Sequence, residues 1–323
     1  MTEQRTGQTS SIGAVWPPAE TSHQRMRGFY TDQVVRTPAD AARFATIFHE
    51  QHEVAERTAG VDRLSIRLVA HASALAVLDY MGVGVEGALP LARTEPNLVV
   101  AYTAANQEGR RMSAEHLANH RELLSAAALR GRSLNGHSHK LQTQNLSAHG
   151  VNPSDADALT AAFAPLYAPF DYSEADVTEL LANQNNTIVY VADGERVVST
   201  AMAEHATVHV GGLGDMHMVE ITEASTHADY RGRGLYKTAS GLLVARVLAE
   251  NQDVNVVYGE SNLAQPGVIY AAHENGRHFS HFDASAYDLG DRTDFGILQQ
   301  NFHIADGAET RQFNDFALSY VRL

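Results

Sequence analysis

The 323-residue sequence contains no cysteine. This absence excludes disulfide bonds, thiolate nucleophiles and metal or iron–sulfur sites built on cysteine. Long apolar runs are absent too, and none reaches the roughly 20 residues that a membrane-spanning helix needs. The N-terminus lacks a charged segment followed by an apolar one, which is the pattern of a secretory signal peptide. We therefore expect a cytoplasmic protein with no membrane partner.

Basic residues are scarce as well. The chain has 24 Lys and Arg against 38 Asp and Glu, which gives a formal net charge of −14. Nucleic acids and anionic membranes attract basic surfaces, so this balance argues against both as partners. Three cations nevertheless lie within seven residues, namely Arg231, Arg233 and Lys237. A basic island on an acidic chain predicts a local polyanionic ligand.

This island lies in the stretch from His227 to Lys237. The β-branched run Met218 to Thr226 before it predicts a strand, and the apolar period from Leu235 predicts a helix. Glycines between the two allow a tight turn, and the first N–H groups of the helix are free to bind a ligand. Phosphate groups commonly bind at such a helix start. The sequence therefore predicts a phosphate-binding turn.

The length fits one large domain or two ordinary ones, and we expect two. The helix and strand patterns along the chain predict a mixed α+β fold. Residues 1–24 show no helical or strand period, and we expect a flexible tail. Residues 25–150 are expected to form a helix-rich α/β domain of unknown role. A change in composition near Asn152 and Pro153 marks the start of the second domain, residues 151–323, which holds the basic island.

The patterns predict the following elements. In the first domain they are a helix that starts at Thr37-Pro38, helices over 70–80 and 114–129, and strands over 64–69 and 98–102. In the second domain they are a helix through Phe163, which Pro165 and Pro169 limit, and a helix over 176–181. Strands follow over 187–192, 196–202, 205–210 and 218–226, with a hairpin turn at Asp193-Gly194, and a helix from 235 to about 251 precedes a strand over 254–259.

Two histidine groups suggest metal binding at first sight. They are His49 with His52 or Glu53, and His137 with His139. The first group lacks the spacing of helical zinc motifs. Because the chain has 17 histidines, chance pairs are expected. We expect solvated or core histidines here and no metal site.

The order of these elements, together with Arg231-x-x-Gly234 at a helix start, resembles the GNAT-type N-acetyltransferases. In that family the glycine turn holds the pyrophosphate of acetyl-CoA. Segments 219–226, 259–262, 296–304 and 313–320 resemble the β-lysine N-acetyltransferase branch. The resemblance covers roughly residues 155–323 and implies a twisted, mostly antiparallel sheet flanked by helices. Tyr236 departs from it, because the family usually has Gly or Ala there.

The resemblance also implies the residues that bind acetyl-CoA. The pyrophosphate would lie at the turn, an open backbone position on the preceding strand would pair with the thioester oxygen and the pantetheine arm, and a residue after the next strand would bond the CoA arm. These cofactor-binding positions are Ala224, Thr226, Arg231, Gly232, Arg233, Gly234, Leu235 and Asn262.

Acetyl transfer to an amine also needs a base, because an alkyl amine with a pKa near ~10.4 is mostly protonated at neutral pH. Glu220 and Glu223 are the candidates, with Glu220 the first choice. Their odd spacing puts them on opposite faces of a strand unless a bulge intervenes. Tyr270 lies where the family's general acid is expected. A salt bridge for either glutamate and a packing role for the tyrosine are the alternatives.

We therefore expect an acetyl-CoA-dependent N-acetyltransferase acting on the primary amine of a small molecule, such as an amino acid or diamino acid, with no metal. The alternative is a non-catalytic acyl-CoA-binding sensor. A degenerate acetyltransferase lobe in the first domain and a homodimer both stay open.

Overall fold

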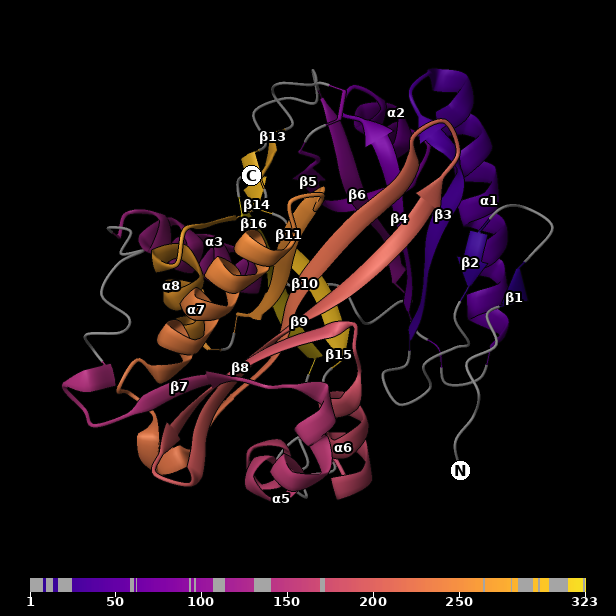
Figure 1. Cartoon of the computed structure of the whole chain (residues 1–323). Coiled ribbons are helices and arrows are strands. Elements are labelled where there is room, and N and C mark those ends of the chain that lie inside the picture. Colours follow the sequence, from indigo (N-terminus) through magenta and orange to yellow (C-terminus); the bar gives the residue numbers. More distant parts are fainter. Residues whose placement is uncertain are drawn as a thin grey trace.

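Two β-sheets pack against each other, and helices cover their outer faces (Figure 1). The computed structural model describes residues 8–9, 14–16, 25–58, 61, 63–92, 94–95, 97–106, 114–130, 141–168, 172–263, 265–279, 281–283, 293–295, 297–301, 313–321 and 323.

The N-terminal sheet has six strands in the order β1-β2-β3-β4-β6-β5. They are β1 (Gln8–Thr9), β2 (Ala14–Trp16), β3 (Arg25–Val35), β4 (Arg63–His71), β5 (Gly84–Pro90) and β6 (Leu98–Asn106). Helices α1 (Pro38–Arg57) and α2 (Ala74–Tyr80) cover its outer face. Phe44 and Phe48 of α1 are buried there, because the apolar residues of this helix fall on one side.

The C-terminal sheet has eight strands in the order β12-β16-β11-β10-β9-β8-β7, with β15 also paired to β16. They are β7 (Ser147–Gly150), β8 (Asn186–Asp193), β9 (Arg196–Val210), β10 (Gly214–Thr226), β11 (Val256–Asn262), β12 (Arg277–Phe279), β15 (Ile297–Asn301) and β16 (Phe313–Val321). A separate pair joins β13 (His281–Asp283) to β14 (Thr293–Phe295).

Helices cover both faces of this second sheet. The helix α7 (Leu235–Glu250) packs on the outer face, beside α8 (Pro266–Glu274) and α3 (Ala114–Ala128). On the inner face, α5 (Ala156–Tyr167) and α6 (Glu174–Ala182) cover the end formed by β8 and β9. The rest of the inner face packs on the N-terminal sheet.

Most predicted elements are confirmed, and four expectations differ. The predicted helix over 70–80 starts only at Ala74, because β4 continues through His71. The strands predicted over 196–202 and 205–210 are one continuous strand, β9. Pro165 lies inside α5 rather than limiting it. Residues 8–9 and 14–16, expected in a flexible tail, form short strands.

The two halves of the chain repeat one arrangement. The N-terminal half runs β3-α1-β4-α2-β5-β6, with its strands in the order β3-β4-β6-β5. The C-terminal half runs β10-α7-β11-α8-β12 and then, after β13 to β15, to β16, in the order β10-β11-β16-β12. In both, the first two strands are parallel and the other neighbours are antiparallel. Thus α1 is the topological counterpart of α7, and β4 that of β11.

The long β9–β10 hairpin joins the two sheets, because its tip reaches β3 (Figure 1). The N–H of Gly211 donates to the carbonyl oxygen of Thr31 at 2.9 Å, and its own carbonyl accepts from the N–H of Val34 at 3.2 Å. A Cβ at Gly211 would collide with the carbonyl oxygen of Asp32. Only glycine therefore allows the backbones to approach so closely.

Candidate active site

The helix α7 begins at an open N-terminus. Its N-cap is Gly234, with a φ of 74°, and no side chain caps it. Gly232 has a φ of 77° and open space where a Cβ would be. Both values favour glycine, and an uncapped helix start offers N–H groups to an anion. The predicted strand, glycine turn and helix are confirmed, while the phosphate stays a prediction.

The cations of the turn divide into two kinds. Lys237 is paired, because its Nζ donates to the carboxylate of Glu274 at 2.7 Å. This hydrogen bond is the main cause that holds the pKa of Glu274 below its usual range. Arg231 and Arg233 stay exposed, and their guanidinium groups donate to backbone carbonyls of the same turn. The basic island of three cations thus presents two at its surface.

Tyr236 stands where the family usually has a small residue, and its side chain contacts a buried arginine. Its hydroxyl accepts a hydrogen bond from Nη2 of Arg277 at 3.1 Å. Arg277 is only 1% exposed, and a Cβ at Gly259 would collide with its guanidinium. The large side chain at position 236 is therefore accommodated by a buried arginine and a glycine in β11.

The strand β10 separates from β11 before either strand ends. Their parallel pairing stops at Ile221 and Gly259, although β11 continues to Asn262. An opening between two strands of a sheet leaves backbone groups without ladder partners. This opening lies at the end of β10 from which the chain continues into α7.

A β-bulge lies in β10 next to this opening. The register with β9 shifts between Thr222 and Ser225, and Glu223 has a φ of 39°. Ser225 and Thr226 pair with β9, so the register with β9 is irregular only at Glu223 and Ala224. The pairing with β11 already ends at Ile221, and the open backbone position expected at Ala224 to Thr226, on the edge that faces β11, stays a prediction.

The bulge brings the two predicted glutamates to one face. Glu220 lies opposite Glu204 of β9 in the ladder, and both belong to the inner face. Glu223 joins them, because its side chain hydrogen-bonds Tyr172, which packs on the α5–α6 cluster of that face. Burial is the main cause that raises the pKa of Glu223; the two carboxylates add to it, and a hydrogen bond with Tyr172 opposes it. The alternative of opposite faces does not apply.

Glu220 is held by a chain of hydrogen bonds from the other sheet. The hydroxyl of Tyr258 donates to Oε2 of Glu220 at 2.7 Å. Burial raises the pKa of Tyr258 well above its usual range, so its hydroxyl keeps its proton. Arg67 of β4 donates from Nη1 to the Tyr258 hydroxyl at 2.8 Å and from Nη2 to Glu260 at 3.2 Å.

The structure does not bring Tyr270 to the glutamates. Tyr270 is on α8, and the guanidinium carbon of Arg130 lies 3.6 Å from the centre of its ring. Its described contacts are on the outer face, where α3 packs on α8. Glu220 and Glu223 are on the inner face.

The remaining predicted positions lie on β10, on β11 and in the first turn of α7. Leu235 is 1% exposed, so it can offer only its backbone. The Thr226 hydroxyl hydrogen-bonds that of Ser199 at 2.8 Å. Ala224 packs partly against the core under α7, and Asn262 is the last residue of β11.

The histidines have ordinary partners where the structure describes them. His49 contacts the carbonyl oxygen of Met81 at 3.0 Å, and His52 lies 3.8 Å from Glu56. His137 and His139 lie outside the described residues. Within the described part of the chain, no three potential ligands gather around a metal position, and no helix has the length and hydropathy of a membrane span.

A family model described as the acetyltransferase (GNAT) domain matches residues 151–262. The chain therefore contains a GNAT acetyltransferase domain. This match includes β8 to β11, the bulge and the glycine turn of α7. The β-lysine branch stays a prediction. No curated protein matches the sequence.

Several solved acetyltransferases are similar to parts of the chain. NAA60 of Arabidopsis thaliana, in complex with acetyl-CoA, is 16% identical with a TM-score of 0.39 over 54% of this chain and 97% of its own. A GNAT-family acetyltransferase from Streptococcus pneumoniae is 12% identical with a TM-score of 0.38, over 54% of this chain and 98% of its own. The assignment of the domain rests on the family model.

The partners of the two glutamates were not predicted from the sequence. Tyr172 precedes α6 in the chain, Tyr258 and Glu260 follow in β11, and Arg67 comes from the N-terminal sheet. Side chains alternate along a strand, so Tyr258 and Glu260 of β11 lie on one face. This spacing of two could have been recognised in the sequence. The pairing of β4 with the acetyltransferase domain has no local signal.

Proposed function

We propose that this protein transfers the acetyl group of acetyl-CoA to the primary amine of a small cationic molecule, such as an amino acid or diamino acid. The observation that carries the proposal is the juxtaposition at β10. A pair of carboxylates and an opening toward β11 lie along β10, and the uncapped helix start follows it in the chain. A GNAT domain over the same residues supports this chemistry.

The residues at the turn fit the pyrophosphate of acetyl-CoA. The backbone from Gly232 to Leu235 would donate N–H groups, and Arg231 and Arg233 would add charge. The bound thioester supplies the acetyl group. Backbone at the bulge, at Glu223 and Ala224, is the candidate donor to its carbonyl oxygen, while Thr226 and Asn262 lie on either side of the opening for the pantetheine arm.

The acidic face fits the amine. An alkyl amine arrives protonated at neutral pH because its pKa is near ~10.4, and carboxylates attract the resulting ammonium. The raised pKa of Glu223 makes it the better base. Glu220 accepts a hydrogen bond and lies 3.9 Å from Arg67. Its carboxylate is already held in place by these two contacts, so we assign Glu220 to binding the ammonium. This reverses the first choice made from the sequence.

The reaction forms a bond between the amine nitrogen and the acetyl carbon and breaks the bond from that carbon to sulfur. Glu223 takes one proton from the ammonium, which frees the amine to attack. The nitrogen loses a second proton as the amide forms, the departing thiolate gains one, and one proton is released to solvent overall. Tyr270 remains the proposed donor of the thiolate's proton on the family resemblance alone, since the described contacts of its ring are with Arg130 on the outer face. Tyr270→Phe should then lower kcat with acetyl-CoA affinity unchanged.

A panel of amines tests the proposal directly. Release of the CoA thiol would be measured with monoamines, diamines, amino acids and diamino acids, and acetyl-CoA binding would be followed by thermal shift. We expect turnover for at least one cationic amine. Stabilisation by acetyl-CoA without thiol release across the panel would instead support the non-catalytic sensor, and no stabilisation at all would reject both.

A further inference from the structure

The N-terminal half contributes a charged side chain to the acetyltransferase domain. Arg67 points from β4 toward β11, where it donates to Tyr258 and Glu260. Its guanidinium carbon also lies 4.8 Å from the ring centre of Tyr102 and 5.4 Å from that of Tyr258. These rings fix the plane of the guanidinium. Arg67 is therefore held in one orientation by groups from both sheets.

The contacts of Arg67 form a relay to Glu220. Nη1 occupies the acceptor side of the Tyr258 hydroxyl, which leaves that hydroxyl's hydrogen to bond Oε2 of Glu220. Nη2 binds Glu260 at the same time. A planar guanidinium can make both contacts at once, whereas an ammonium is a single point of charge. The orientation of Glu220 thus depends on a residue more than a hundred positions away in the chain.

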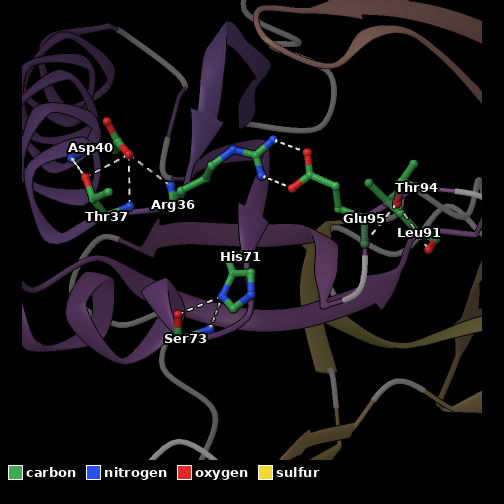
Figure 2. Close-up of polar contacts among 8 residues, drawn as sticks. All are labelled: Arg36, Thr37, Asp40, His71, Ser73, Leu91, Thr94 and Glu95. Carbon is green, nitrogen blue, oxygen red and sulfur yellow. Dashed lines mark hydrogen bonds and ion pairs between the residues drawn. The ribbon is translucent and has the colours of Figure 1, made fainter.

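The counterpart of the glycine turn in the N-terminal half is closed. At the start of α1, the carboxylate of Asp40 accepts from the N–H groups of Arg36 and Thr37 at 3.1 and 2.9 Å (Figure 2). These backbone hydrogen bonds and the Thr37 hydroxyl hold the pKa of Asp40 below its usual range. Pro38 removes one more N–H group. The site that an anion would take is filled by the chain itself.

We propose that the N-terminal half is a second acetyltransferase-like lobe that binds no acyl-CoA and instead completes the active site through Arg67, a positioning residue for Glu220. The inference rests on the proposed function. The lobe has the repeated strand order of the acetyltransferase domain but a closed helix start. What it supplies is the relay from Arg67 through Tyr258 to the amine-binding carboxylate.

The test compares Arg67→Met, Arg67→Lys, Glu220→Gln and the double variant Arg67→Met with Glu220→Gln. Arg67→Met should raise KM for the amine by about tenfold, the value of a charge-assisted hydrogen bond, and leave Kd for acetyl-CoA unchanged. Arg67→Lys should behave like Arg67→Met, because lysine cannot hold both partners. The double variant should be no worse than Glu220→Gln alone, since both changes act through one carboxylate.

Arg36→Met is the matched control, because Arg36 also forms a two-pronged ion pair in the N-terminal half, with Glu95 (Figure 2). Its kinetics should equal those of the wild type. Additive effects in the double variant, a KM lowered by Arg67→Met or wild-type behaviour of Arg67→Lys would each overturn the inference. Absence of turnover in the wild type would overturn the proposed function, and the inference with it.

Discussion

The hydroxyl of Tyr167 donates to the backbone carbonyl oxygen of Glu223 at 3.1 Å. Glu223 has a φ of 39°, a region that costs most residues on the order of 1 kcal/mol. Tyr167 is fully buried between α5 and the sheet. The helix α5 therefore fixes the bulge and, with it, the side of the sheet to which the Glu223 carboxylate points.

Glu223→Gln should lower kcat on the order of a hundredfold or more, because it removes the proposed base. A base must be deprotonated, so wild-type activity is lost as pH falls through the pKa of Glu223. Since that pKa is raised, the loss should begin at a higher pH than for an ordinary glutamate. Profiles of kcat against pH check this. Glu220→Gln is the comparison and should mainly raise KM; equal profiles for both variants would contradict the assignment.

Glu223→Gln should also stabilise the fold at neutral and higher pH. A raised folded-state pKa means that the protonated form favours the fold, and this contribution is lost as pH rises through that pKa. Glutamine mimics the protonated form at every pH. The melting temperature of the variant should therefore exceed that of the wild type above the raised pKa and equal it at low pH. A difference that does not change with pH would contradict the pKa shift.

The strand, turn and helix around Gly234 could be predicted because their local signals agree. The β-branched run forms a strand, the glycines take a positive φ and the apolar period continues through α7. The Asp193-Gly194 hairpin was predictable for the same reason, since Gly194 has a φ of 59°. In these segments the neighbours along the chain decide the structure.

Other features depend on contacts between distant segments. The strand β3 carries Arg25, Arg27 and Asp32 and therefore shows no apolar period, while β5 contains two glycines and a proline. Sheet neighbours make both of them strands. The relay from Arg67 to Glu220 needs the two sheets to be packed. The two halves share an order of strands in their sheets. This repeat could not be predicted from the residue patterns.

Gly232→Ala should separate the cost of backbone strain from the loss of ligand binding. Gly232 and Gly212 both have a φ of 77° and open space at the Cβ position. Alanine at either site should cost about 1 kcal/mol of folding free energy. Only Gly232→Ala should weaken acetyl-CoA binding, because Gly212 lies in the β9–β10 turn. Denaturant unfolding and calorimetric titration check the two effects; equal binding by both variants would remove Gly232 from the site.

Arg231→Ala should weaken acetyl-CoA binding by about tenfold, the effect of one charge-assisted contact to phosphate. Arg36→Ala, directly before the N-cap of α1, should leave the affinity unchanged, because Asp40 closes that helix start. Calorimetry should give one acetyl-CoA per chain. Two sites per chain, or equal weakening by both variants, would show that the N-terminal lobe also binds the ligand.

Gly211→Ala should loosen the contact between the two sheets. The added Cβ would collide with the carbonyl oxygen of Asp32, so the backbone hydrogen bonds of Gly211 to Thr31 and Val34 must break or lengthen. Each lost bond costs on the order of 1 kcal/mol. Because the same packing brings β4 to β11, the variant should lose stability and also raise KM for the amine. Gly212→Ala, one residue further along the turn, controls for backbone strain and should change stability alone; unchanged KM in Gly211→Ala would show that the Arg67 relay does not depend on this contact.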